Sequence, residues 1–264
     1  MNKSQFLKLL GPKTQRPNLN SKIIKQINSK KYVLEKVSYL VEKNERVNSY
    51  FFLPKKKRKF PVVICHHQHA SRYNIAKSEI AGIRGNKNLS YAKEIAERGI
   101  ATLAIDAIGF EERNKLGKNW WGVEYFEMAS RIINGKTLLE KTLSDLSAAI
   151  DYIVSRTEVD NKRIGFIGHS YGGRMACILP AYDKRIKVSV ANCYARLLKN
   201  SLDIKKNTRI PMELVVPNIL KFGDFSDFLK LSNNCNVLLS VSKKDKWSQD
   251  AMEIYKKTKK FFKK

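Results

Sequence analysis

The chain has 264 residues, 43% of them hydrophobic, and a formal net charge of +27. A chain of this length and composition can bury one large core, so a single domain is expected. Lysine outnumbers arginine and is spread along the whole sequence, without a paired Cys/His finger or an RNA-binding aromatic motif. Composition therefore favours a solvated basic surface over specific nucleic-acid recognition, with non-specific attraction to anionic surfaces expected.

The four cysteines lie in or next to apolar runs and are widely spaced, which favours buried reduced thiols over a disulfide framework. No apolar run reaches the length of a membrane-spanning helix, and residues 1–15 lack the core of a signal peptide. We therefore expect a cytoplasmic protein without a membrane span.

Residues 1–30 are polar and basic with a few apolar side chains, and we expect an N-terminal arm or helix there, ahead of one domain at 31–264. Residues 32–41 and 47–53 alternate β-forming and polar residues on either side of a turn, which predicts an antiparallel hairpin. The basic run at 54–59 lies between two strands, so it is interpreted as a solvated loop rather than a localisation signal.

A buried strand at 61–65 leads into a cluster of histidines. His67 and His69 are two residues apart and would point the same way on extended backbone, so with Cys65 or His66 they could bind a metal. No spaced carboxylate or second Cys/His group completes such a site, and no metal is expected.

The middle of the chain alternates helical and strand patterns, which predicts a mostly parallel sheet with helices on both faces. Thr137 and Glu140 have capping-box spacing ahead of a helix with one apolar face. The aromatic segment 119–128 is either core or a cover for an active site. Helical spacing is found at 88–98 and 246–264, strand patterns at 100–105, 186–193 and 236–242, and short helical pieces at 210–231.

The most informative stretch is a strand at 164–167 that enters a Gly-x-Ser-x-Gly turn centred on Ser170, with a helical pattern at 173–179. This order is typical of a nucleophile elbow, where the serine lies on a strained turn and small residues let neighbouring backbone approach. An acyl-transfer reaction also needs an oxyanion hole. We predict that its donors are the N–H of Tyr171 and the N–H of Gln68 or His69, after the earlier strand.

Five segments together resemble the dienelactone hydrolase-related and acetyl xylan esterase-like α/β-hydrolases, from Tyr32 to the end of the chain. The resemblance implies an α/β-hydrolase fold with a serine nucleophile, an acid after the penultimate strand and a histidine after the last strand. Ser170 matches the nucleophile and Asp245 matches the acid. The matching segments are His67-Gln-His69, Lys77-Ser-Glu-Ile-Ala-Gly82, Asp106-Ala-Ile-Gly-Phe-Glu-Glu-Arg113, Gly168-His-Ser-Tyr-Gly-Gly173 and Val216-Pro-Asn-Ile-Leu220.

No histidine matches the third member of the triad. The four histidines of the chain, His66, His67, His69 and His169, all precede Ser170, whereas the family order is serine, acid, histidine. We therefore expect a C-terminally incomplete α/β-hydrolase domain. The alternative is a base supplied by His67 or His69, although both lie on the side of the oxyanion hole. Without a base, a serine is a poor nucleophile at neutral pH.

The sequence thus predicts a serine hydrolase of carboxylic esters that forms an acyl-enzyme on a small-molecule ester and needs no cofactor, with activity impaired by the absent histidine. One alternative is a catalytically inactive hydrolase-like binding protein. Another is an electrostatic binder of nucleic acid or anionic membrane, whose binding would fall steeply with salt. The acyl and alcohol groups of the substrate and the oligomeric state stay open.

Overall fold

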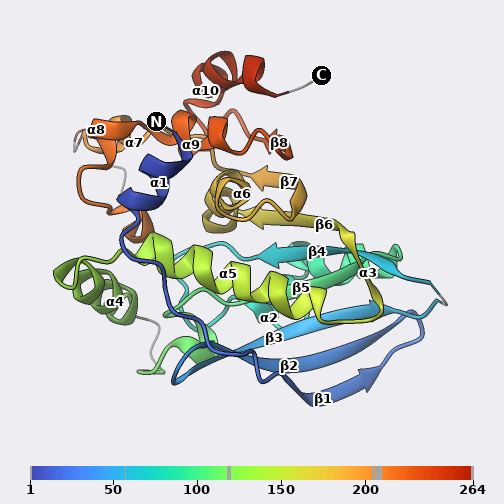
Figure 1. Ribbon diagram of the computed structural model, residues 1–264. Coiled ribbons are helices and arrows are strands. Elements are labelled where there is room, and N and C mark those ends of the chain that lie inside the picture. The colour runs from blue at the N-terminus through green and yellow to red at the C-terminus, as the bar shows by residue number, and fades with distance from the viewer. Residues whose placement is uncertain (1, 57, 118–119, 204, 206–209, 263–264) are drawn as a thin grey trace.

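The computed structural model describes residues 2–56, 58–117, 120–203, 205 and 210–262. Its described residues form an eight-stranded sheet in the order β1-β2-β3-β5-β4-β6-β7-β8 (Figure 1). The first three strands and β5 pair antiparallel, and β5, β4, β6, β7 and β8 pair parallel. The strands are β1 (Lys22–Asn28), β2 (Tyr32–Glu42), β3 (Glu45–Pro54), β4 (Phe60–His66), β5 (Ala101–Ile105), β6 (Val159–His169), β7 (Ile186–Asn192) and β8 (Asn236–Ser240).

This architecture confirms the predicted α/β-hydrolase class and the antiparallel N-terminal hairpin. Strands β2 and β3 pair with Val37 opposite Ser49, so their alternating side chains keep one face in the core. Strand β1 was missed, because it was included in the expected arm. Its residues are all exposed and its isoleucines do not alternate, so main-chain pairing with β2 rather than a buried face defines it.

Helices cover both faces of the sheet (Figure 1). On one face, Ala92 and Ala96 of α3 (Tyr91–Glu97) pack with Cys65 and Ala104 of the central strands. The opposite face carries α5 (Leu138–Val154) and α6 (Tyr171–Tyr182) over the larger core. The other α-helices are α1 (Lys3–Leu9), α2 (Lys77–Ile80), α4 (Gly122–Ile133), α7 (Leu198–Ser201), α8 (Ile219–Phe222), α9 (Phe225–Leu231) and α10 (Ala251–Thr258).

The segment after α1 runs along α5 (Figure 1), and the start of that helix corrects one prediction. The Thr137 hydroxyl caps α5 by accepting the Glu140 N–H at 3.1 Å, as expected. The Glu140 carboxylate does not close a capping box. It accepts instead from the backbone N–H and the hydroxyl of Thr14, so its oxygens are directed toward the N-terminal segment rather than toward the cap. The Thr137 hydroxyl also donates to the Leu10 carbonyl at 2.7 Å.

Thr137→Ala is expected to lower the free energy of unfolding by about 1–2 kcal/mol, because the substitution removes the helix cap and the bond to Leu10. Thr137→Ser keeps the hydroxyl and is the matched control. Urea denaturation of the three proteins measures the difference. Equal stability of the alanine and serine variants would contradict this role for the hydroxyl.

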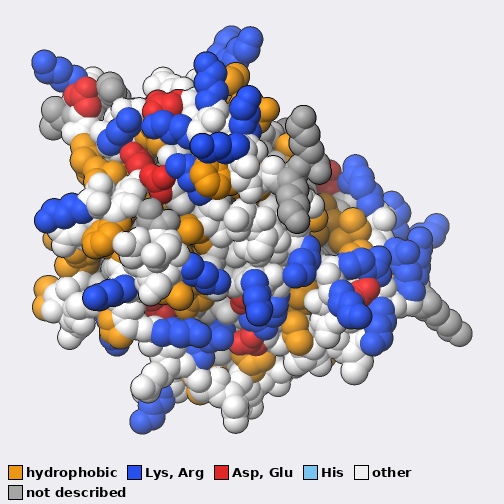
Figure 2. Space-filling view, turned by 45° about the horizontal axis from the view of Figure 1, so that its top comes forward, with side chains coloured by type: hydrophobic (Ala, Val, Ile, Leu, Met, Phe, Trp, Pro, Cys, Tyr) orange, Lys and Arg blue, Asp and Glu red, His pale blue; other side chains and the backbone are white. Residues whose placement is uncertain are grey.

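The surface is basic without a single basic stripe. Figure 2 shows lysine and arginine side chains spread across the visible face, with few acidic side chains between them. All four cysteines are free, which agrees with the sequence prediction, and Cys65, Cys177 and Cys235 are buried. None of the helices within the described ranges is both long and apolar enough to cross a bilayer.

Candidate active site

Ser170 lies at the tight turn between β6 and α6, at the carboxyl edge of the parallel strands. Its backbone has φ 54° and ψ −102°, a left-handed value of φ that costs a residue with a Cβ on the order of 1–3 kcal/mol. The Ser170 N–H donates to the Asn192 carbonyl at 2.8 Å, and the Ser170 carbonyl accepts from Arg174. These bonds to β7 and to the first turn of α6 hold the strained turn in place.

Three glycines make this turn possible. A Cβ on Gly168 would lie 2.1 Å from the carbonyl carbon of Gly172, and one on Gly172 would lie 2.1 Å from the His66 carbonyl oxygen. A Cβ on Gly173 would lie 2.7 Å from the Asn192 carbonyl oxygen. Each clash is with backbone, which cannot rotate away as a side chain can. The elbow therefore depends on close packing of α6 against β4 and β7.

Gly172→Ala is expected to lower the free energy of unfolding by at least about 2 kcal/mol, because the added methyl must push α6 away from the end of β4. Gly165→Ala is the matched control on β6, since a Cβ there would meet its nearest atoms at 3.4 Å. Thermal unfolding followed by circular dichroism measures both. Equal melting temperatures for the two variants would show that the elbow has room to relax.

The segment after β4 lies beside the start of α6, because the Gly172 N–H donates to the His67 carbonyl at 3.0 Å. The predicted oxyanion donors Gln68 and Tyr171 are thereby brought to the same region. Among the hydrogen bonds between described residues, none uses the backbone N–H of Tyr171, Gln68 or His69. These N–H groups are the kind of donor that an oxyanion hole requires.

The ring of His67 holds this segment rather than facing Ser170 with a free nitrogen. Its Nε2 accepts from the Ala107 N–H at 3.0 Å, so Nδ1 carries the proton and donates to the Gln68 carbonyl at 2.8 Å. Burial lowers the pKa of His67 to about 4, with small opposing effects from its hydrogen bond to Gln68 and from Glu111. His67 is therefore neutral at physiological pH, and both its nitrogens are engaged.

His69 is tied to residues that the sequence analysis did not single out. Its Nδ1 accepts from the Ser71 N–H at 3.0 Å, so its Nε2 carries a proton and donates to the Glu124 carboxylate at 2.9 Å. The Tyr73 hydroxyl also donates to this carboxylate, at 3.0 Å. Glu124 lies in the first turn of α4, within the predicted aromatic segment, so the start of that helix is bonded to the histidine segment. Its distance of 55 residues from His69 left no signal in the sequence.

Asp245 follows β8, one strand beyond β7. Its carboxylate accepts from the Ser248 hydroxyl at 2.6 Å and the Trp247 N–H at 3.1 Å, which fixes its own loop. His169 is the last residue of β6 and directly precedes Ser170, with its Nδ1 3.0 Å from the side-chain amide of Asn192. Burial lowers the pKa of His169, and the negative charge of Asp245 partly opposes this shift. No described histidine forms a hydrogen bond to Asp245 or to the Ser170 hydroxyl.

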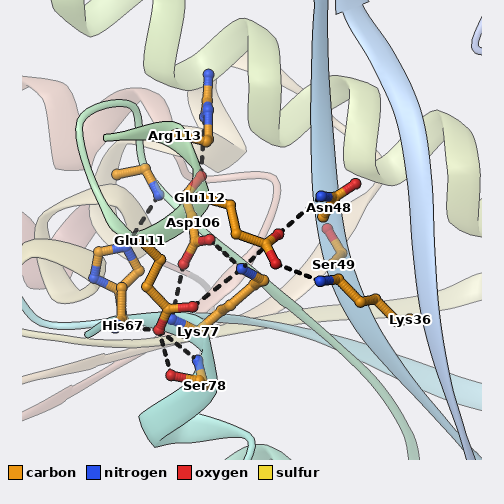
Figure 3. Close-up of polar contacts among 12 residues, drawn as sticks. Lys36, Asn48, Ser49, His67, Lys77, Ser78, Asp106, Glu111, Glu112 and Arg113 are labelled. Atoms are coloured by element: carbon orange, nitrogen blue, oxygen red, sulfur yellow. Dashed lines mark hydrogen bonds and ion pairs between the residues drawn. The ribbon is translucent and has the colours of Figure 1, made fainter. Parts of the chain in front are cut away.

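Two of the motif segments noted in the sequence meet in one buried ionic cluster, which we call the Lys77 cluster: Lys77, Asp106, Glu111 and Glu112 (Figure 3). The fully buried Lys77 ammonium lies 2.5 Å from Asp106, 3.1 Å from Glu111 and 3.4 Å from Glu112. Burial alone would lower the pKa of Lys77, but the Asp106 and Glu111 carboxylates raise it, so it stays charged. Burial raises the pKa of Asp106 to about 7, against the opposing effect of Lys77.

The Lys77 cluster fixes the loop that follows β5. The Asp106 carboxylate also accepts from the Lys77 N–H at 2.9 Å, and its carbonyl accepts from the buried Arg113 guanidinium at 2.9 Å. The next residue, Ala107, donates its N–H to His67. The cluster thus supports the histidine segment that carries Gln68, and through it the backbone beside the elbow.

The fold and the strained serine turn define an α/β-hydrolase. The model of the dienelactone hydrolase family matches residues 47–218, which is more than half of the chain, and the chain belongs to that family. It is a member of a family of hydrolases.

Individual relatives agree with this assignment. YtaP of Bacillus subtilis, which carries the name of a hydrolase, is 32% identical over 193 residues, covering 72% of this chain and 62% of that protein. The chain thus spans less than two thirds of that relative. Solved structures show the same fold at low identity. One is a CE15 esterase from a marine bacterial metagenome, with a TM-score of 0.67 and 16% identity, where the match covers 98% of this chain and 78% of that one. Another is the methylesterase BT1017, with a TM-score of 0.73 and 17% identity, where the match covers 98% of this chain and 52% of that one.

Proposed function

We propose that the protein is a carboxylic ester hydrolase that acts through an acyl-enzyme on Ser170. The observation that carries this proposal is the strained turn, since φ 54° at a serine between three glycines costs stability and presents the hydroxyl at the edge of the sheet. The names of the structural relatives, a CE15 esterase and a methylesterase, support an ester as the substrate class.

In the proposed reaction, the Ser170 oxygen bonds to the acyl carbon while its proton passes to a base, and the alcohol leaves with that proton. Water then attacks the acyl-enzyme and releases the acid. The N–H groups of Tyr171 and of Gln68 or His69 would hold the negative oxygen of each tetrahedral intermediate. Asp245 would orient the base and stabilise its charged form.

The base is the missing part of this mechanism. In the described structure, His67 and His69 use both ring nitrogens in other contacts, and His169 bonds to Asn192. We therefore propose that the 264 residues by themselves turn over esters slowly, with His67 as the alternative base within the chain. His67→Asn tests that alternative, because it removes a base while keeping a polar side chain near Ala107.

A second candidate function is a hydrolase-like binding protein that keeps the pocket without turnover. It is favoured by the same observation that weakens catalysis, the lack of a hydrogen bond from any described histidine to Ser170. A protein with this function would need the elbow for shape rather than for chemistry.

A fluorophosphonate probe distinguishes the two functions, because it reacts with activated serines. We expect slow labelling that peptide mass spectrometry places on Ser170 and that Ser170→Ala abolishes. Ser21→Ala, an exposed serine on the N-terminal segment, is the control and should label like the native chain. No labelling at Ser170 over many hours would favour the binding protein.

A further inference from the structure

A strained turn lies directly after the candidate oxyanion donors. The Arg72 N–H donates to the His69 carbonyl at 3.1 Å, which closes a tight turn over Ala70 and Ser71. Both central residues have a positive φ, 47° and 53°. A turn of this kind favours glycine or asparagine, so alanine and serine are held in it at a cost in stability. Such strain persists only where surrounding contacts impose it.

The ring of His69 is the contact that holds this turn. Its Nδ1 accepts from the Ser71 N–H at 3.0 Å, and its Nε2 donates to the Glu124 carboxylate at 2.9 Å. The Tyr73 hydroxyl lies 3.0 Å from Nε2 and 3.0 Å from the same carboxylate oxygen. The side chain of Glu124 is 1% exposed, so water competes little for these bonds. A buried carboxylate on α4 therefore fixes the turn.

The loop after β5 packs against the same group of side chains. The Phe110 ring is stacked on Tyr73, with centroids 4.8 Å apart, and lies edge-on to the His69 ring at 5.2 Å. A Cβ on Gly109 would lie 3.3 Å from the Glu124 nitrogen, so this loop also approaches the start of α4 closely. The His69 ring thus has little room to leave the carboxylate.

The backbone held by these contacts carries the candidate oxyanion donors. The N–H groups of Gln68 and His69 form no hydrogen bond to a described residue, and the adjacent His67 carbonyl is bonded to Gly172 in the elbow. An oxyanion hole works because its donors are aimed at the developing charge before the reaction begins. A strained turn relaxes once the contacts that impose it are lost, so release of the His69 ring would let this peptide rotate and turn its N–H away.

We propose that Glu124 is a positioning residue for the reaction at Ser170. Through the His69 ring, it holds the backbone N–H groups of Gln68 and His69 in the geometry that binds the oxyanion. In this role Glu124 neither contacts the substrate nor transfers a proton. The inference rests on the proposed acyl-enzyme function, and it adds the start of α4 to the residues that support that site.

The test compares two probes that react with Ser170. One is a fluorophosphonate, and the other is its counterpart with sulfur in place of the P=O oxygen. In both reactions the Ser170 oxygen bonds to phosphorus, fluoride leaves, and the serine proton passes to the solvent. Sulfur is a weaker hydrogen-bond acceptor than oxygen, so an aligned oxyanion hole accelerates the oxygen probe more than the sulfur probe. The ratio of the two labelling rates, measured by peptide mass spectrometry, therefore reports the alignment of the donors.

Glu124→Leu removes the acceptor for His69 and keeps a buried side chain. It should slow labelling by the oxygen probe at least about tenfold, since loss of one oxyanion donor costs about 10²–10³ in turnover, and should slow the sulfur probe less than about threefold. Glu124→Gln keeps an acceptor oxygen and should restore most of the ratio. Glu127→Gln is the matched control, because Glu127 lies on the same helix but pairs with Arg131 at 3.3 Å. Melting temperatures check that each variant is folded.

The ratio separates alignment of the donors from a purely structural role. An equal loss of labelling with both probes in Glu124→Leu would overturn the proposal, because the residue would then support the fold without aligning the hole. An equal fall of the ratio in Glu127→Gln would overturn it as well. If neither probe labels Ser170 in the native chain, the proposed acyl-enzyme function fails, whereas a native chain that labels with a ratio independent of Glu124 refutes this inference alone.

Discussion

Replacing Lys77 by methionine is expected to lower the free energy of unfolding by about 3–5 kcal/mol, because it leaves buried carboxylates without their cation. The Lys77 ammonium is the group on which Asp106, Glu111 and Glu112 converge, and methionine keeps its length but not its charge. Lys36→Met is the matched control. Lys36 pairs with Glu112 at a partly exposed position, and its loss should cost at most about 1 kcal/mol.

The pH dependence of the free energy of unfolding should show whether Lys77→Met destabilises the protein through electrostatics or through lost packing. In the native chain the pKa values of Glu111 and Glu112 are lowered despite burial, Glu112 to about 2, so their stabilising effect is present above the unfolded pKa near 4.5 and fades on acidification. In Lys77→Met, Asp106 and Glu111 lose the positive charge that most lowers their pKa values, so these pKa values rise, whereas Glu112 keeps its hydrogen bond from Lys36. Protonation of these carboxylates then removes their unpaired negative charge, so the variant loses less stability as the pH falls.

The difference in stability between Lys77→Met and the native chain should therefore shrink as the pH falls from above 7, where Asp106 is ionised in the native chain, to about pH 3. Chemical denaturation across this range measures it. A difference that stays constant with pH would mean that methionine disturbs packing, and a difference as small as that of Lys36→Met would mean that the cluster contributes little.

Local patterns explain why much of the fold could be predicted. The turn around Ser170 needs small residues at Gly168 and Gly172, because neighbouring backbone passes close to both positions. The pattern of strand, turn and helix therefore lies within one short stretch of sequence and can be recognised there. Strand β1 escaped prediction because its residues are exposed on both sides and carry no alternation. Pairing with β2 is a tertiary effect that the segment itself does not encode.

Long-range contacts explain most of what could not be predicted at the site. Lys77 and Asp106 are 29 residues apart, and their motifs gave no reason to expect that one would neutralise the other in the core. The bond from His69 to Glu124 likewise joins the segment after β4 to the first turn of α4. The competition for Glu140 between the helix cap and Thr14 was decided by a segment more than a hundred residues away. The spacing of residues along the sequence does not show which of these distant side chains pair in the fold.

The largest change in activity is expected from supplying a histidine beside Asp245. Tested by itself, the 264-residue chain should hydrolyse a small activated ester very slowly, and Ser170→Ala should change the rate little, because no described histidine forms a hydrogen bond to the Ser170 hydroxyl. A fusion that appends a strand and a histidine loop from another family member after residue 264 should raise turnover by at least about 10³-fold, since loss of the histidine from a serine protease costs about 10⁶-fold.

The same fusion should also cover the open edge of β8 and reduce aggregation, which light scattering can follow. The control is an appended strand whose loop carries alanine in place of the histidine. It should reduce aggregation as well but leave hydrolysis slow, so that the two effects separate. Initial rates of all four proteins, the native chain and the fusion each with and without Ser170→Ala, complete the test. Fast Ser170-dependent hydrolysis by the native 264 residues would overturn this expectation and would identify His67 or His69 as a base that rearranges when substrate binds.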